Sequence, residues 1–441
     1  MLDESIDHRA ELEIISLDVM VPQDHLLRKI DKVVDFSYVY DLTKDYYRQD
    51  FGRPAVDPVV LVKMAFIQHI FGIKSLRQTA KEVDMNMAYR WFLGFSFFTQ
   101  VPHFATLSYA FATRFPSELF ERIFAWILEE IANKGFLSTS TVFIDSTHIK
   151  ANANRKKRYK ELAVETARSY DKRLREEINA ERINNGDKPY DDDTPPRVKE
   201  VIKSVTDPDS GLFVKGEHKV EFAYSAHVAC DGNNFIISKE VTAGNVHDSR
   251  VFDKVYDDSV NKFPEIETVA VDAGYKTPWI YKKVIDDKRN ISTPYKRPMG
   301  KVNYFRPYEY VYDEYFNCVL CPENKVLDYR GVNREGYRSF RNKVSTCNNC
   351  NSKFKCTVSK VKSVLKHIWS DYIEIAEDFR HSPEGKSSYA LRSQTIERVF
   401  ADAKEKHGMR YSFIRGLERV NNWITMKFSA MNLKKLAMWA A

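Results

Sequence analysis

Two short runs of β-branched and aromatic residues, each followed at once by an aspartate, constrain the fold of this chain more than any other feature. The runs are residues 141–144, before Asp145, and residues 268–271, before Asp272. Each has the pattern of a short buried strand, and we expect each strand to end at its aspartate. Because strand ends in an α/β sheet present side chains to a ligand crevice, the two runs predict an α/β fold that brings Asp145 and Asp272 together.

Further elements fit an α/β core over residues 136–297. Alternating runs at 220–230 and 235–241 flank a turn of sequence Asp-Gly-Asn-Asn, which is a strong hairpin signal. A helix is expected over 249–260. Residues 155–203 interrupt this core with a polar, charged helix and a loop rich in Asp and Pro, which predicts an inserted charged helical arm.

The segment before the core has helical periodicity, with apolar residues three and four positions apart from residue 22 to 135. It predicts an α-helical N-terminal domain over residues 1–135. Within it, residues 75–83 and 87–93 outline two short helices joined by a tight turn, as in a helix-turn-helix. Helix pairs of this length are mostly ordinary packing units, so a DNA-binding N-terminal domain is the minority interpretation on local sequence alone.

Glu397 is the candidate for a third carboxylate beside the two aspartates. It lies on a helix expected over 393–406, which has an apolar face on one side. A helix packed across the strand ends would bring Glu397 to them. Phosphodiester hydrolysis and strand transfer use two Mg²⁺ or Mn²⁺ ions, and such hard cations prefer carboxylate oxygens. Asp145, Asp272 and Glu397 are therefore the expected catalytic and metal-binding residues.

Five of the six cysteines lie between residues 318 and 356. Cys318 and Cys321 form one Cys-x-x-Cys pair, Cys347 and Cys350 form another, and this spacing predicts a structural Zn²⁺ site. Cys356 is a fifth candidate, which leaves open which four bind; the alternative is reduced thiols without metal. The pattern predicts a zinc-binding basic insertion over 298–370, followed by closing helices of the core over 371–441.

Charge and hydropathy indicate the cellular compartment of the protein and say little about its activity. The chain has 441 residues with 68 Lys and Arg against 61 Asp and Glu, a net charge of +7. The acidic start predicts no secretory signal, and the lack of a long apolar run predicts no membrane span. Together with the clustered cysteines, this indicates a cytoplasmic protein.

The sequences Phe-Ile-Asp-Ser-Thr-His-Ile-Lys-Ala-Asn at 143–152, Val-Ala-Val-Asp-Ala-Gly-Tyr at 269–275 and Ile-Glu-Arg-Val-Phe at 396–400 closely resemble those of bacterial insertion-sequence DDE transposases. The resemblance extends over nearly the whole chain. It implies an RNase-H-like catalytic core with a zinc-ribbon-like insertion, and cut-and-paste transposition. In that reaction the enzyme cleaves at the terminal inverted repeats, and the freed 3′ hydroxyl attacks target DNA. It also implies a homodimer in the synaptic complex.

The family's Tyr, Arg, Glu, Lys signature maps onto Tyr389, Arg392, Glu397 and Lys404. Lys404 follows Glu397 by seven residues, so both point to one helix face, where Lys404 can hold a phosphate. Arg392 precedes Glu397 by five residues, one more than in the commonest signature. That spacing rotates Arg392 off the face if one helix runs through both. DNA contact and capping or packing of the helix start are therefore equal alternatives for Arg392 and Tyr389.

Basic clusters flank the catalytic segments, at 155–158 after Asp145 and at 404–419 after Glu397. Lys156, Lys157 and Arg410 are the expected phosphate contacts in these clusters. His148, His227 and His247 with Asp248 are expected to fix polar turns, not to bind metal. Two rival functions remain: an RNase-H-like nuclease or resolvase without strand transfer, and a domesticated, non-catalytic DNA-binding protein.

Overall fold

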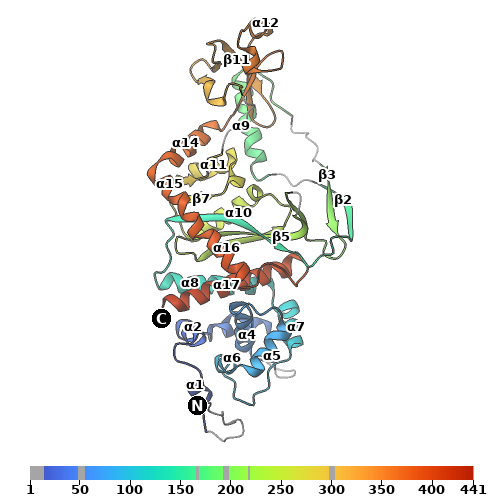
Figure 1. The fold of residues 1–441 in the computed structure, drawn as a ribbon, viewed down its shortest axis with the longest axis vertical. Coiled ribbons are helices and arrows are strands. Elements are labelled where there is room, and N and C mark those ends of the chain that lie inside the picture. The colour runs from blue at the N-terminus through green and yellow to red at the C-terminus, as the bar shows by residue number, and fades with distance from the viewer. Residues whose placement is uncertain are drawn as a thin grey trace, which may run out of the picture.

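The computed structural model describes residues 14–47, 55–164, 168–191, 198–216, 219–296 and 303–440. Figure 1 shows an elongated molecule with a helical region at one end, a mixed α/β region in the middle and a small β module at the other end. None of the helices in these described ranges has both the length and the apolar character needed to cross a membrane.

The N-terminal region is helical, as predicted. Asp57 caps the start of one helix, with Pro58 in its first turn, and Ser75 and Asn86 cap two others through their side chains. The helices capped by Ser75 and Asn86 are separated by Asn86 alone, so the predicted short helix pair is confirmed. Its first helix is longer than expected and ends at Met85. The helices are α1 Leu17–Met20, α2 Leu26–Val33, α3 Tyr38–Thr43, α4 Pro58–Ile70, α5 Leu76–Met85, α6 Met87–Phe92, α7 Phe104–Tyr109 and α8 Ser117–Asn133.

The C-terminal helix α17, Leu417–Trp439, joins the helical region to the α/β region. Its residues Val420, Ile424 and Phe428 belong to the core of the α/β region. Leu433 and Leu436 belong to the core of the N-terminal helices, where α17 packs against α2, α4 and α8. The predicted closing helix of the catalytic core is therefore shared between two cores, and Figure 1 shows it lying beside α8 between them.

The central sheet has the strand order β6-β5-β1-β7-β8, with β4 pairing beside β6 on the same edge of β5. Strand β1 pairs antiparallel with β5 and parallel with β7, and β7 pairs parallel with β8. The predicted hairpin of β5 and β6 is confirmed. The elements are β1 Thr141–Lys150, β4 Gly211–Lys215, β5 Lys219–Cys230, β6 Ile236–Ala243, α10 Phe252–Lys262, β7 Thr268–Val271, α11 Pro278–Asp286 and β8 Asn290–Ser292.

Strand β1 does not end at Asp145, as the sequence suggested, but continues to Lys150. The reason is its second neighbour. Pairing with β7 stops at Ile144 and Val271, whereas pairing with β5 continues through Asp145 opposite Val228 to Lys150 opposite Ala223. Asp145 therefore lies in the middle of a strand, at the point where one of its two neighbours ends.

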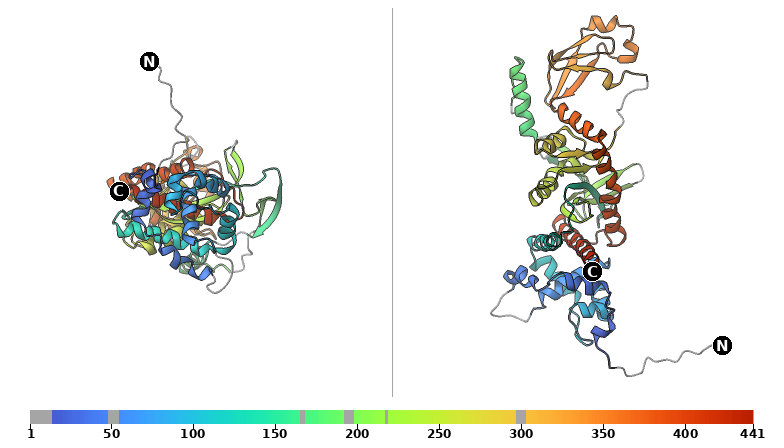
Figure 2. Two further views of the ribbon diagram at one scale, coloured as in Figure 1. Left: turned by 90° about the horizontal axis from the view of Figure 1, so that it is seen from below. Right: turned by 90° about the vertical axis from the view of Figure 1, so that its left-hand side faces the viewer.

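The inserted arm contains more than the predicted charged helix. Strands β2, Arg158–Val164, and β3, Val198–Ser204, form a separate two-stranded antiparallel ribbon, which projects from the side of the molecule in Figure 1. Helix α9, Asp171–Asn184, follows β2 and extends toward the β module (Figure 2). Glu181 of α9 accepts two hydrogen bonds from Arg338 of that module, at 2.8 and 2.9 Å.

The β module is a five-stranded antiparallel sheet of order β13-β12-β11-β10-β9 with a core around Val319, Leu327 and Phe340. Helices α14 and α15 then lead back along β8, and α16 packs against β1. The elements are β9 Val311–Asp313, β10 Cys318–Leu320, β11 Val326–Val332, β12 Tyr337–Arg341, α12 Val344–Asn348, α13 Lys353–Cys356, β13 Ser363–His367, α14 Ser370–His381, α15 Pro383–Ala390 and α16 Ile396–Glu405.

Candidate active site

Asp145 and Asp272 occupy neighbouring positions on adjacent strands. The parallel ladder of β1 and β7 ends with Ile144 opposite Val271, and each aspartate is the next residue of its strand. The side chain of Asp145 is 19% exposed, while Asp272, the first residue after β7, is exposed. The structure therefore brings the two sequence-predicted aspartates side by side at the edge where β7 ends.

Arg392 is the direct partner of Asp145. Its Nη2 atom lies 2.5 Å from Oδ2 of Asp145, and its side chain is 5% exposed. The short 3₁₀ turn η6, Leu391–Gln394, carries Arg392, and Thr395, with φ −111° and ψ −98°, separates that turn from α16. No single helix runs through Arg392 and Glu397, so the rotation expected from their five-residue spacing does not apply.

Burial sets the ionisation of Asp145. Removal from water raises the pKa of this carboxyl group to about 6; the positive charge of Arg392 and the backbone N–H of Ser146 oppose the rise, and the charges of Asp272 and Asp248 add to it. A carboxylate with these neighbours is costly to keep charged without a cation. Arg392 supplies one positive charge, and its Nη1 atom has no hydrogen-bond partner among the described residues.

Tyr389 connects the third acid to this pair. Burial raises the pKa of Tyr389, the charge of Arg392 lowers it, and the charges of Asp272, Glu397 and Asp145 raise it again. The guanidinium of Arg392 lies 5.7 Å from the centre of the Tyr389 ring. Glu397 is exposed in the first turn of α16, the helix that packs on β1. All three predicted acids thus act electrostatically on one phenol.

A second phenol at the site was not singled out from the sequence. Tyr275, in the turn η4, Ala273–Tyr275, is 1% exposed, and its hydroxyl has no hydrogen-bond partner among the described residues. Burial raises its pKa well above the usual value, and the charges of Asp248, Asp145 and Asp272 contribute. The only sequence signal is its place three residues after Asp272, in the stretch 269–275.

The predicted DNA-contacting lysines and arginines differ in how deeply they are buried. Lys404 is half-buried in the last turn of α16, seven residues after Glu397, so both project from one helix face. Lys156 and Lys157 are exposed in the turn between β1 and β2. Arg410 is exposed and forms an ion pair with Glu405. By contrast, Arg392 is buried against Asp145.

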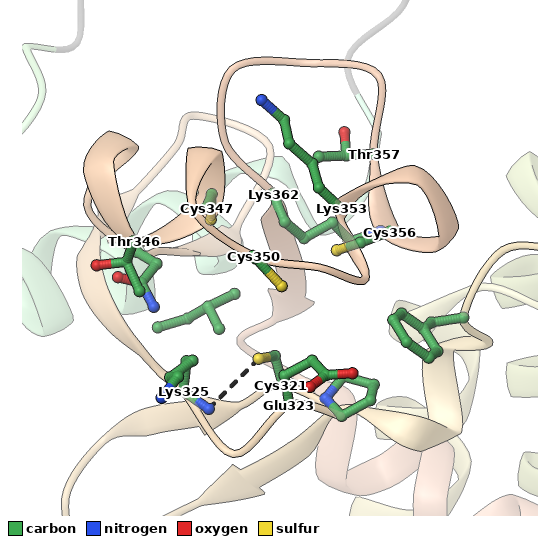
Figure 3. Close-up of a pocket in the computed structure, with 14 residues that line it drawn as sticks. Cys321, Glu323, Lys325, Thr346, Cys347, Cys350, Lys353, Cys356, Thr357 and Lys362 are labelled. Carbon is green, nitrogen blue, oxygen red and sulfur yellow. Dashed lines mark hydrogen bonds between the residues drawn. The ribbon is translucent and has the colours of Figure 1, made fainter.

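Four cysteines of the β module line one small cavity of about 30 Å³. They are Cys321, Cys347, Cys350 and Cys356, and Figure 3 shows Cys321, Cys350 and Cys356 with their sulfur atoms turned toward the middle of the group. The backbone N–H of Lys325 donates a 3.4 Å hydrogen bond to Sγ of Cys321. Cys318 is not among the lining residues: it lies in β10, between Asp313 and Asp328 of the neighbouring strands.

Both donor sets match the chemistry of the metals expected from the sequence. Carboxylate oxygens suit Mg²⁺, and thiolates suit Zn²⁺; a cavity of about 30 Å³ has room for a single ion. Within the described ranges, however, no three His, Cys, Asp or Glu side chains are gathered closely enough to hold a metal ion as they stand. Both groups of side chains would have to draw together around a cation.

Comparison with known families assigns the two ends of the chain. Residues 15–113 match a transposase domain (DUF772), and residues 320–437 match a transposase DDE domain. The second match includes the cavity cysteines, Arg392, Glu397 and Lys404, whereas Asp145 and Asp272 lie outside both matches. No curated protein matches the chain. A transposase domain at one end and a transposase DDE domain at the other support an insertion-sequence DDE transposase.

Proposed function

We propose that this transposase cleaves DNA at the ends of its element and joins the freed 3′ ends to target DNA, with two divalent ions held by Asp145, Asp272 and Glu397. The observation that carries the proposal is the placement of the two aspartates side by side where the β1–β7 ladder ends. Glu397 lies on α16, which packs on the same strand β1. Together these placements support one shared site for three acids that lie more than 100 residues apart in sequence.

The sheet supports an RNase-H-like catalytic core. Its strands β6, β5 and β1 are antiparallel, and β7 and β8 continue the sheet parallel to β1. The acids lie on the central strand β1, directly after β7, and on a helix packed across β1. In an open sheet with parallel strands, ligands bind beyond the carboxyl ends of those strands, and Asp272 occupies that position.

The side chains divide the work of the reaction among them. When bound, two Mg²⁺ or Mn²⁺ ions activate the attacking oxygen and neutralise the leaving alkoxide. Asp145 and Asp272 are proposed to hold both ions between them, and Glu397 to complete the second site. Lys404, on the face of α16 that carries Glu397, holds a phosphate. Arg392 neutralises Asp145 in the metal-free protein and contacts a phosphate, beside Tyr389, once a cation has replaced it.

The basic residues around the site support DNA as the substrate. Lys156 and Lys157 are exposed in the turn after the strand that carries Asp145, and Arg410 is exposed shortly after α16. Contacts of this kind position the DNA backbone without reading its sequence. The DNA consists of the terminal inverted repeats and the target, and we propose that two copies of the chain hold the two ends.

We also propose a structural Zn²⁺ in the β module, held by Cys321, Cys347, Cys350 and Cys356. These four cysteines line one cavity, and a backbone N–H already donates to one of their sulfur atoms. The first sequence-predicted pair does not act as a unit here, because Cys318 lies in β10 outside the cavity. Metal binding would fix the α12–α13 segment to the end of the sheet.

The test uses purified full-length protein, a DNA fragment carrying the inverted repeats found beside the gene, and a target plasmid. Asp145→Asn, Asp272→Asn and Glu397→Gln should each lower Mg²⁺-dependent cleavage by roughly a thousandfold or more, with end binding retained in a gel-shift assay. Asp402→Asn is the matched control, since Asp402 pairs with Lys406 on the same helix. Normal cleavage by the Asp145 variant would overturn the proposal. Cleavage without joining would identify a nuclease instead.

A further inference from the structure

A fourth acid, Asp248, lies over the turn that carries Asp272. It begins the short 3₁₀ turn η3, Asp248–Arg250, which packs against η4 after β7. A Cβ atom added at Gly274 would lie 3.4 Å from Oδ2 of Asp248. The side chain of Asp248 is 28% exposed. From the sequence, Asp248 was expected only to fix a polar turn with His247.

The hydroxyl of Tyr275 shows that this acid belongs with the other two. It is buried and has no hydrogen-bond partner among the described residues. Of the neighbouring charges that act on its pKa, Asp248 has the largest effect, followed by Asp145, by Arg392 with the opposite sign, and by Asp272. The charge of Asp248 also acts on Asp145 itself. Three carboxylates and one guanidinium thus act on this buried oxygen, and the excess of negative charge favours a further positive ligand.

His227 faces Asp248 from the other side. It is 1% exposed in β5, and its Nε2 atom lies 3.0 Å from Oγ1 of Thr242, whose own hydroxyl donates to the carbonyl of Ala243. Because that hydroxyl donates to Ala243, we assign the imidazole proton of the neutral ring to Nε2. This leaves the Nδ1 lone pair facing Oδ1 of Asp248 at 3.6 Å, with no hydrogen-bond partner among the described residues.

We propose that Asp248 is a fourth carboxylate of the divalent-metal site and that His227 positions it. The inference rests on the proposed function and extends it, because the three-acid set does not include Asp248. Two electron-rich atoms that face each other at 3.6 Å repel unless a cation or a donor, such as a water molecule bound to the metal, lies between them. His227 acts on the metal through Asp248 and is a positioning residue.

Metal binding provides a readout that is independent of DNA cleavage. Free Mn²⁺ is measured by electron paramagnetic resonance while it is titrated with full-length protein in the absence of DNA. Asp248→Asn should weaken Mn²⁺ binding about tenfold or more, the range seen when a supporting acid is lost from a metal site. Asp257→Asn is the control, since Asp257 pairs with Lys283 on the surface of α10, and it should bind as the unaltered protein does. Asp145→Asn serves as the reference for the proposed metal site.

The two hypotheses fail in different ways. If Asp248→Asn binds Mn²⁺ normally while Asp145→Asn does not, the fourth-carboxylate inference is wrong and the three-acid site stands. If Asp145→Asn also binds normally, the proposed metal site is wrong, and the inference fails with it. Circular dichroism and thermal melting of each variant separate a lost ligand from a lost fold.

Two substitutions of His227 test its positioning role. The amide of Asn reaches the place of Nδ1, whereas the longer Gln reaches the place of Nε2. The His227→Asn variant should therefore keep most of the Mn²⁺ affinity of the unaltered protein. The His227→Gln variant should bind Mn²⁺ as weakly as Asp248→Asn does. The double variant of Asp248→Asn with His227→Gln should bind no more weakly than Asp248→Asn alone. Equal effects of Asn and Gln, or additive losses in the double variant, would contradict the positioning role.

Discussion

The guanidinium of Arg392 donates a hydrogen bond of 2.5 Å to the carboxylate of Asp145, from a turn that lies 247 residues further along the chain. Both side chains are largely buried, so each charge depends on the other for compensation. The ion pair occupies the same carboxylate that the proposed metal site needs. A cation that binds there must therefore compete with Arg392.

Replacement of Arg392 should make the protein depend more strongly on metal. Arg392→Gln leaves a buried carboxylate without its cation, a change that typically costs about 3 to 5 kcal/mol when one partner of a buried ion pair is lost. Excess Mg²⁺ should restore more stability to this variant than to the unaltered protein, because the metal meets no competing guanidinium. Melting curves with EDTA and with MgCl₂ measure both effects. Arg398→Gln, exposed on α16, is the control, and an equal Mg²⁺ response in the two variants would contradict the prediction.

The raised pKa of Asp145 gives metal affinity a pH dependence. With a pKa of about 6, the carboxyl group holds its proton at lower pH, so Mn²⁺ affinity should fall by up to tenfold for each pH unit below about 6. The stability that Asp145 contributes to the metal-free fold changes with pH in the opposite direction to the Mn²⁺ affinity. The folded-state pKa lies above the ordinary value of 3.8, so the stabilisation is complete below about 3.8 and is lost as the pH rises through about 6. Mn²⁺ titrations at several pH values test the first effect; flat affinity across pH 6 would refute it.

The cysteines differ in what they should contribute to zinc content. Cys356→Ser removes a side chain that lines the cavity, whereas Cys318→Ser changes a strand residue outside it. Elemental analysis of purified protein should find about one zinc per chain in the unaltered protein and in Cys318→Ser, and little in Cys356→Ser. Cys350→Ser should behave as Cys356→Ser does. Full zinc in the Cys356 variant, or loss in the Cys318 variant, would contradict this ligand set.

The strands could be predicted where their own pattern is strong. Residues 268–271 form β7 as expected, and the hairpin of β5 and β6 formed around its Asp-Gly-Asn-Asn turn. The extent of β1 was wrong, because residues 145–150 are kept extended by pairing with β5, a contact between distant segments that leaves no local signal. Similarly, the ribbon of β2 and β3 was missed because its two strands are charged, mostly exposed and far apart in sequence.

The candidate site shows the same limit. The types of its acids could be predicted, because Mg²⁺ chemistry requires carboxylates. The partner of Asp145 could not, because it depends on the break at Thr395 that releases Arg392 from α16. Asp248 and His227 belonged to an apparent polar turn, and only the packing of η3 on η4 brings Asp248 to Tyr275. Of the two Cys-x-x-Cys pairs, only Cys347 and Cys350 both line the cavity, because Cys318 lies in β10.

The turn between β1 and β2 should contribute to DNA affinity without sequence preference. Lys156→Ala and Lys157→Ala each remove an exposed positive charge near the strand that carries Asp145. Each should weaken binding to end DNA and to unrelated DNA by similar factors and reduce the salt slope by about 1. Fluorescence anisotropy across a salt series measures both. Lys254→Ala, which removes an exposed lysine of α10 paired with Glu240, should change neither; an unchanged slope in the Lys156 and Lys157 variants would count against DNA contact there.

Lys427 gives the junction between the two cores a distinct pH dependence. It lies on α17, 3% exposed, where its Nζ atom donates a 2.5 Å hydrogen bond to the carbonyl of His407 and lies 4.4 Å from the centre of the Trp423 ring. Burial lowers its pKa from 10.5 to about 7. Between these values the unfolded chain holds a proton that the folded chain has lost, so the stability contributed by this group rises with pH.

Lys427→Met keeps an apolar side chain at this position and removes the titration. The difference in the free energy of unfolding between Lys427→Met and the unaltered protein should therefore shift in favour of the unaltered protein by up to about 1.4 kcal/mol for each pH unit above 7. Urea unfolding at several pH values measures this difference, and other titrating groups cancel because both proteins share them. Lys254→Met, at an exposed position of α10, should give curves parallel to those of the unaltered protein. Parallel curves for Lys427→Met as well would mean that Lys427 stays charged in the folded protein.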